Sequence, residues 1–336
     1  MKRKSVITLT ISIITLIALT LIPLVIENDS TINLVILILL YIMLASSWNI
    51  LGGYTGQTNL GHAAFFGIGS LATRILWIDG FPFLPSLLAG GLLAVFLALL
   101  IGVPAFKLKG VYFAIGTLAL ALMLNLTAGN IFPEMSYNPG LSDYQLLPRY
   151  YLFLGLTVIT IITTILLTRS RIGLGMMAVR EGEDAAESLG INSLKHKLIA
   201  FSISALFAGL AGGAFAYYHV SYYLYMPFGP EWTFDPMMMA YIGGQGTIIG
   251  PIIGVLFFVG LKQLLVWNVG EYHLIIFGTL FILIVLFLPG GLLEVWHKTS
   301  KYINRQLGKR KKDIPVSPGS TNHESLPNGK ELPIDK

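Results

Sequence analysis

The sequence predicts an all-α integral membrane protein of about ten transmembrane helices, with Gly-interrupted segments, an inverted repeat and both termini cytoplasmic. Of the 336 residues, 54% are hydrophobic and only 12% are charged, whereas a soluble domain has about 25% charged residues. The apolar residues form runs long enough to cross a bilayer. The basic residues gather in three places that lie between or beside these runs.

The distribution of charge distinguishes the two faces of the predicted bundle. Lys and Arg cluster at residues 2–4, in a central polar segment at 169–197, and at 298–312. Because basic residues that flank spans mark the cytoplasmic side, all three clusters are expected there. The net charge of +5 is therefore a topological signal, and no nucleic-acid partner is expected. Cysteine is absent, so no disulfide framework or thiolate metal site is expected. No cofactor is expected either.

The first apolar run is expected to be a retained transmembrane span. It follows Lys2-Arg3-Lys4, as the apolar part of a secretory signal would. However, it extends from Ser5 to Ile26, which is 22 residues without a charge, and no small-residue cleavage pattern follows it. Residues 1–30 are therefore interpreted as a first span with its flank.

The remaining apolar segments are close to the roughly 20 residues that a span needs. They are residues 31–51, 52–78, 84–106, 110–133, 150–168, 198–218, 236–267 and 272–293. The second of these is rich in glycine and contains His62 and Arg74, so we expect it to be less regular than the others.

The segment at 236–267 decides the number of crossings. It is broken by Gly243-Gly244-Gln245-Gly246 and by Gly250-Pro251. If it forms two short spans, the total is ten and the basic tail lies inside, as the distribution of positive charge requires. A single long span gives nine crossings and places the tail outside. We therefore expect a membrane domain at 31–296 and a cytoplasmic tail at 297–336, which is basic at first and disordered from about Asp313.

Two glycine-rich segments are the candidates for mechanism. Gly52–Gly69 carries Gln57, Asn59 and His62, and irregular backbone in a membrane is tolerated only when it is buried in protein or lines a cavity. The alternative reading is close helix packing at glycines and alanines. Tyr241–Gly254 carries Gln245, and both segments contain Gly-Gln followed by another glycine. Interrupted spans in two halves of a chain are typical of an inverted repeat with its pathway between the halves.

A third segment predicts tight helix packing. Small residues recur every four positions along residues 198–218, in two stripes formed by Ala205, Gly209 and Gly213 and by Ala208, Gly212 and Ala216. Such stripes allow helices to approach closely in lipid.

The central segment at 169–197 predicts a contact with a soluble partner. It has five Lys/Arg and four Asp/Glu between two apolar runs. A helix is expected from Met176 to Leu189, with acidic residues in its first turns and Gly190 as the stop signal. We expect Leu189 and Ile191 to anchor it against the membrane body. The alternative is a solvated amphipathic loop.

The source of energy is expected to lie outside this chain. The clean spans contain no Asp or Glu, and Glu231, Asp235 and Glu271 are placed at span edges, so ion coupling has no obvious acceptor. No phosphate-binding loop of the form G-x-x-x-x-G-K-[ST] is present. If ATP drives the protein, another subunit binds it.

Several segments, in order from about Tyr41 to Leu293, resemble the permease subunit of branched-chain amino acid ABC importers. They are GQTNLGHAAFFGIGS, GVYFAIGTLALA, AVREGEDAAESLGINSLKHKLIAFSISALFAGLAGGAFA, GGQGTIIGPIIG and LPGGLL. The resemblance implies a non-enzymatic, multi-pass subunit of the bacterial inner membrane. It also implies two ATP-binding subunits, a related second permease or a second copy of this chain, and an extracytoplasmic substrate-binding protein.

The resemblance also implies roles for particular residues. A short cytoplasmic coupling helix in this family docks on the ATPase, and the matching residues are Glu183, Ala185, Ala186, Glu187 and Gly190, with Arg180 and Glu181 nearby. ATP binding would then drive alternating access. The polar candidates for the pathway are Gln57, Asn59, His62 and Gln245.

Three alternatives remain open from the sequence. Related permeases carry urea, short amides or simple sugars. An ion-coupled secondary transporter would act alone on an ion gradient. A passive pore would conduct a solute such as urea without a partner.

Overall fold

The computed structural model describes residues 2–26, 28–131, 135–136, 144–219, 221–223, 225–269, 278–279, 282 and 290–294. The chain divides into two units, Met1–Val295 and Trp296–Lys336. The predicted tail and the predicted span at 272–293 lie largely or wholly outside the described residues.

The described part of the first unit is almost entirely helical. Its elements are α1 (Lys2–Val25), α2 (Asp29–Gly52), α3 (His62–Ile78), α4 (Phe83–Ala105), α5 (Val111–Ile131), β1 (Met135–Ser136), α6 (Leu146–Arg169), α7 (Arg171–Glu181), α8 (Glu183–Ser188), α9 (Ser193–Tyr218), β2 (Tyr222–Tyr223), η2 (Met226–Phe228), α10 (Glu231–Gly243) and α11 (Ile249–Val269). The strands β1 and β2 pair antiparallel.

Five of these helices are long and apolar enough to cross a bilayer, namely α2, α4, α5, α6 and α9. Their outer faces are apolar as well: Leu92, Phe96 and Leu100 of α4 and Leu126 of α5 are all more than 60% exposed. Such a surface suits contact with lipid chains, because hydrocarbon replaces the buried neighbours that a soluble protein would need.

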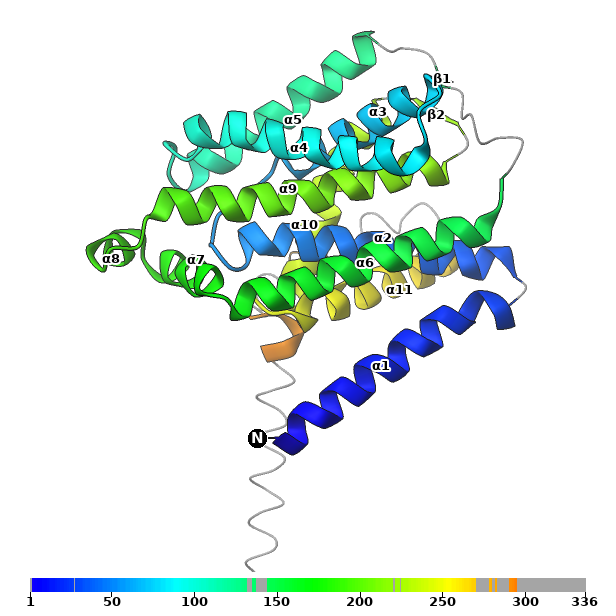
Figure 1. Ribbon diagram of the computed structural model, residues 1–336, viewed down its shortest axis with the longest axis horizontal. Coiled ribbons are helices and arrows are strands. Elements are labelled where there is room, and N and C mark those ends of the chain that lie inside the picture. Colours follow the sequence, from blue (N-terminus) through cyan, green and yellow to red (C-terminus); the bar gives the residue numbers. More distant parts are fainter. Residues whose placement is uncertain are drawn as a thin grey trace, which may run out of the picture. The chain divides into compact units, whose positions relative to one another are not determined.

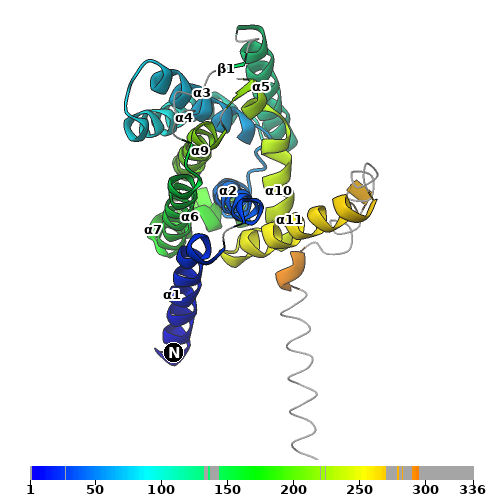
Figure 2. The ribbon, with the colours of Figure 1, turned by 90° about the vertical axis from the view of Figure 1, so that its right-hand side faces the viewer.

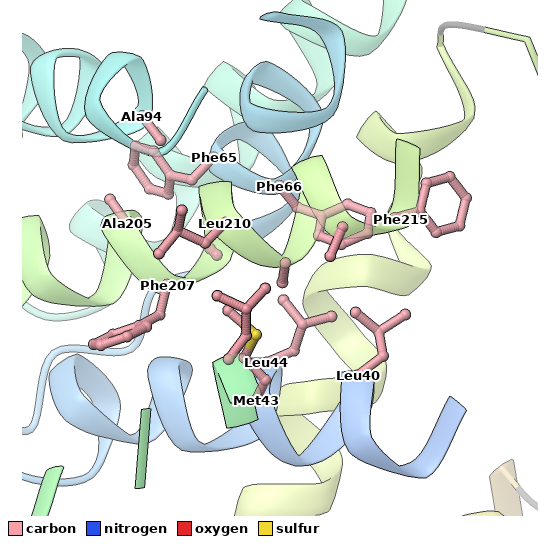
Figure 3. Close-up of a cluster of buried hydrophobic side chains, with 14 of the residues drawn as sticks. Leu40, Met43, Leu44, Phe65, Phe66, Ala94, Ala205, Phe207, Leu210 and Phe215 are labelled. Carbon is pink, nitrogen blue, oxygen red and sulfur yellow. The ribbon is translucent and has the colours of Figure 1, made fainter. Parts of the chain in front are cut away.

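Helix α2 is the centre of the bundle. It packs against α6, α9, α10 and α11, and the view along the helices shows it surrounded by them (Figure 2). Its side chains Leu40, Met43 and Leu44 meet Phe66 of α3 and Phe215 of α9 in the buried core (Figure 3).

The predicted small-residue stripes of α9 are confirmed. All six residues are buried, and α9 makes its most extensive contacts with α3 and α4. A Cβ atom on Gly212 would overlap the Phe66 carbonyl oxygen, and one on Gly209 would touch Ala94. Close approach of three backbones therefore depends on these glycines.

Two short helices begin in the interior of the bundle. Helix α3 starts at His62, so the expected irregular stretch at 52–69 is irregular only as far as Gly61. Helix α10 starts at Glu231, and the ring of its Trp232 stacks on that of Tyr41, halfway along α2 (centroids 6.1 Å apart). The Thr233 hydroxyl accepts a hydrogen bond from the Ala63 amide (2.8 Å), so the two helix starts meet at this depth.

The predicted break in the segment at 236–267 is confirmed, since residues 244–248 separate α10 from α11. The 13 residues of α10 rise only about 20 Å, less than the roughly 30 Å hydrocarbon core. The single helix expected from Met176 to Leu189 is wrong in detail: Gly182 divides it into α7 and α8.

The two ends of the helices carry different structures. Helices α7 and α8 lie at one end, next to the end of α6 and the start of α9, while β1 and β2 lie at the other (Figure 1). The Lys109 ammonium lies 3.9 Å from the Asp184 carboxylate, so the α4–α5 connection belongs to the α8 end.

The contact between α3 and α9 yields a stability test. Replacement of Gly212 by Leu should lower the free energy of unfolding by about 1–3 kcal/mol, because the added side chain meets the backbone of α3. The measurement is the thermal midpoint and the monodispersity of the detergent-solubilised protein. Gly155→Leu is the matched control, because nothing lies within 4 Å of a Cβ at that helical glycine. Equal stability of the two variants would contradict the packing described.

Candidate coupling and translocation sites

Helices α7 and α8 form a short polar hairpin between the end of α6 and the start of α9. The Ser170 hydroxyl caps α7 by accepting a hydrogen bond from the Gly173 amide (3.1 Å). Gly190 ends the hairpin with a φ of 84°, which confirms it as the predicted stop. Asn192 then caps α9 by accepting from the Lys195 amide (2.8 Å). These caps fix the position of α8 beyond the ends of two long helices.

The residues of α8 divide into an inner and an outer face. Ala185 and Glu187 of α8 are exposed, and so is Gly190, which follows the helix. Ala186 is only 2% exposed, so it packs against the permease body and not on a surface that a partner could reach. Leu189 is 82% exposed, so the expectation that it anchors the helix is wrong, whereas Ile191 is partly buried. Ala186 was assigned to the partner contact from the family resemblance, whereas Leu189 was placed on a single helix from Met176 to Leu189 that Gly182 divides.

An ion pair joins α8 to α9. The Lys197 ammonium lies 2.6 Å from the Glu183 carboxylate, and the two side chains are 4% and 29% exposed. The ammonium also lies 5.9 Å from the centroid of the Phe106 ring. A buried charge is tolerated only when it is paired, so Glu183 holds the start of α8 against α9.

Arg180 joins α7 to the two glycine-rich segments. Its guanidinium donates a hydrogen bond to the Gly53 carbonyl at the end of α2 (2.6 Å). Its side chain lies against Gly246 as well. Although we expected Arg180 near the ATPase, its guanidinium is therefore directed into this chain.

Asn49 of α2 completes this contact. Its Oδ1 accepts a hydrogen bond from the Gly246 amide (2.8 Å), and its Nδ2 donates to the Thr247 carbonyl (2.9 Å). The Gly-Gln segments at 56–57 and 244–245 therefore lie near the same end of the bundle. Equivalents in an inverted repeat would lie at opposite ends, so the suggested correspondence of these two segments is wrong.

The four polar residues proposed for the pathway do not form one site. Gln57 and Gln245 are partly exposed near the α7 end, whereas Asn59 and His62 are buried at the start of α3. The His62 Nε2 lies 3.0 Å from the Ser47 hydroxyl, and the Asn59 Oδ1 accepts from the Gly61 amide (2.8 Å). Both side chains keep one buried nitrogen without a partner, His62 Nδ1 and Asn59 Nδ2.

The sequence reasoning missed two ionisable residues within apolar helices. Asp235 is not at a span edge: it lies within α10, and its carboxylate accepts a hydrogen bond from the Tyr41 hydroxyl (3.1 Å) halfway along α2. The Lys262 ammonium of α11 lies 4.0 Å from the same carboxylate. The signal was present in the sequence, because a lysine inside an apolar run is a candidate functional residue by default.

Among the described residues, no group of three or more His, Cys, Asp or Glu side chains is arranged to hold a metal ion.

The apolar bundle, the helices that begin inside it and the polar hairpin at one end together define a multi-pass membrane permease. Over residues 30–285 the chain matches the family described as the permease component of the branched-chain amino acid transport system, and it belongs to that family.

Its relatives include the high-affinity branched-chain amino acid transport system permease protein LivM of Escherichia coli. The two are 28% identical over 317 residues, which cover 82% of this chain and 73% of the relative. A probable LivM of Methanocaldococcus jannaschii is 25% identical over 76% of this chain and 90% of its own. The guanosine ABC transporter permease protein NupQ of Bacillus subtilis is 34% identical over 93 residues, 25% of this chain and 29% of its own. No solved structure matches significantly.

The ion pair between α8 and α9 predicts an asymmetry between two variants. Glu183→Ala should destabilise the protein by about 3 kcal/mol or more, because it leaves the buried Lys197 ammonium unpaired. Lys197→Met should cost about 1 kcal/mol or less, since Glu183 can be hydrated and Met suits the contact with Phe106. Thermal midpoints in detergent measure the difference, and equal effects or the reverse order would refute this view of the pair.

Proposed function

We propose that this chain is the membrane-spanning subunit of an ATP-driven importer of branched-chain amino acids in the bacterial inner membrane. The observation that carries the proposal is the family match over residues 30–285, combined with an exposed polar hairpin at one end of the bundle. The chain itself is a transport subunit, and ATP would be hydrolysed on partner subunits.

The outer face of α8 would dock on an ATP-binding subunit. Ala185, Glu187 and Gly190 are exposed at the far end of the hairpin and fit this role. Glu181 is exposed beside them. Because Ala186 is buried, we assign it the packing of α8 and not contact with the ATPase.

Two links would carry a displacement of the hairpin into the membrane. Lys197 and Glu183 connect α8 to α9, and Arg180 connects α7 to the end of α2 and to the α10–α11 connection. These are the elements around the interior helix starts. A population shift between outward- and inward-open states would follow if ATP closure of the partners moved the hairpin.

The arrangement supports ten crossings with both termini on the α8 side. Helix α11 begins close to Gly244 and is about 30 Å long. Gly290 and Gly291, further along the chain, lie beside Gly244, at the end of the bundle where α11 begins. This return favours an even number of crossings. The positions of Lys107 and Lys109 at the same end agree with a cytoplasmic side there.

An inverted repeat is supported by a different correspondence from the one first expected. Helix α2, the irregular residues 53–61, short α3 and long α4 follow one another in the first half of the chain. Helix α9, the connection with β2 and η2, short α10 and long α11 repeat the same order. Each element of this second set is oriented opposite to its counterpart in the first set, since α2 ends and α9 begins at the α7/α8 end of the bundle. Contacts are also reciprocal, since α3 packs on α9 and α10 packs on α2.

The proposed organisation keeps residues 1–30 as a separate first span, 31–296 as the permease domain with its coupling segment at 169–197, and 297–336 as a cytoplasmic tail. The family match begins at residue 30, after α1. The proposed partners are two ATP-binding subunits, a second permease that is either related or identical, and an extracytoplasmic binding protein.

A different solute is the second candidate. The similarity to the guanosine permease protein NupQ over 93 residues favours a nucleoside within the same class of transporter. An ion-coupled transporter can no longer be dismissed for want of an intramembrane carboxylate, because Asp235 is one. Family membership argues against it instead.

The test is uptake in proteoliposomes that contain the permease, the ATP-binding subunits and the binding protein. Leucine should accumulate only with ATP, and Ala185→Trp should reduce uptake and stimulated ATP hydrolysis at least about tenfold by blocking the docking face. Ala185→Ser is the matched control and should behave as the natural chain. Uptake by this chain alone on an ion gradient, or full transport by the Trp variant, would overturn the proposal.

A further inference from the structure

Asp235 of α10 and Lys262 of α11 place opposite charges within two apolar helices. The carboxylate of Asp235 and the ammonium of Lys262 lie 4.0 Å apart, with side chains 20% and 46% exposed. Tyr41, which bonds to Asp235, is halfway along α2, so the pair is near mid-depth of the membrane. The pair joins α10 and α11, the two helices on either side of the second glycine-rich segment.

The exposure of Lys262 is informative at this depth. An ammonium that faces hydrocarbon is strongly unfavourable, and ionisable groups in spans normally face the bundle interior or an aqueous cavity. The Lys262 side chain does not reach along α11 to the aqueous boundary of the membrane, because its ammonium lies beside the Asp235 carboxylate. We therefore expect the exposed side of this pair to face another protein surface or a water-filled space, and not lipid.

A cavity of about 360 Å³ reaches toward this pair from the end of the bundle opposite α8. Its lining runs from Ser30 to Leu40 along α2, a rise of about 15 Å or half the hydrocarbon thickness. The walls are mainly apolar, and Asn33, His219 and Gln263 provide polar groups. This size and composition suit a small ligand with an apolar side chain.

Trp232 is the boundary between the cavity and the charged pair. It lines the cavity, and its ring stacks on Phe66 (centroids 4.4 Å apart) and on Tyr41. Asp235 lies three residues further along α10 and therefore on the same face of the helix. Lys262 is next to the cavity-lining Gln263 in α11.

We propose that Asp235 and Lys262 form a binding site for a zwitterionic α-amino acid, with Asp235 accepting from its ammonium and Lys262 donating to its carboxylate. The cavity that Trp232 lines receives the apolar side chain of the amino acid. This inference rests on the proposed function and adds the residues that recognise the substrate's charges. A displacement of α10 that moves Trp232 opens the cavity to the pair, and the substrate then replaces each partner of the ion pair by one of its own charges.

The test uses the complete transporter and measures leucine transported per ATP hydrolysed. Asp235→Asn and Lys262→Gln should each lower this ratio about ten- to a hundredfold, because each leaves one substrate charge without its partner. Binding-protein-stimulated ATP hydrolysis should persist in both variants. Glu231→Gln is the matched control, because this exposed acid lies four residues earlier in the same helix, and its ratio should stay close to that of the natural chain.

The double variant D235N/K262Q, which removes both charges at once, separates binding from structure. If the pair only holds α10 to α11, removal of both charges leaves no unpaired ion, and the double variant should recover transport; that result would overturn the inference. A transport ratio that stays low in the double variant supports the inference. Normal ratios in both single variants also overturn it, whereas absence of leucine uptake by the natural chain contradicts the proposed function itself.

Discussion

A polypeptide in hydrocarbon must satisfy every backbone amide and carbonyl within the protein, and the interior start of α3 depends on this constraint. The Leu60 amide donates to the Thr117 hydroxyl (3.1 Å), the Ala63 amide donates to the Thr233 hydroxyl (2.8 Å), and the Trp48 indole donates to the Asn59 carbonyl (2.8 Å). Side chains from α2, α5 and α10 thus replace the helical bonds that residues 53–61 do not make. The interruption is stable only because these helices surround it.

The same interruption connects the hairpin of α7 and α8 with the interior of the bundle. Residues 53–61 begin at Gly53, whose carbonyl binds Arg180 of α7, and end where α3 meets Thr233 of α10. The rigid contacts of α9 with α3 and α4 provide a fixed frame, since their glycines leave no free volume. The hairpin of α7 and α8, residues 53–61 and α10 are therefore in continuous contact. Such contact is the physical requirement for a movement of α8 to affect the cavity that Trp232 lines.

Composition was sufficient to predict the helices that contact lipid, the break before α11 and the stripes on α9, because these depend on local apolar content and on glycine. It was insufficient for features that depend on how helices meet. Asp235 was assigned to a span edge because its depth follows from the interior start of α10, which no local pattern indicates. Ala186 was assigned to the docking face from the family resemblance, and only the packing of α8 in three dimensions shows that its side chain is buried. The unpartnered nitrogens of Asn59 and His62 are likewise visible only in three dimensions.

The central claim is that α8 lies on the cytoplasmic face and contacts a partner there, and labelling of a single cysteine tests it most directly. The natural chain has no cysteine, so Ala185→Cys provides one exposed thiol. A membrane-impermeant maleimide should label it in inside-out vesicles and not in right-side-out vesicles, and addition of the ATP-binding subunits should protect it. Labelling from the outer face, or labelling that the ATP-binding subunits leave unchanged, would contradict the account.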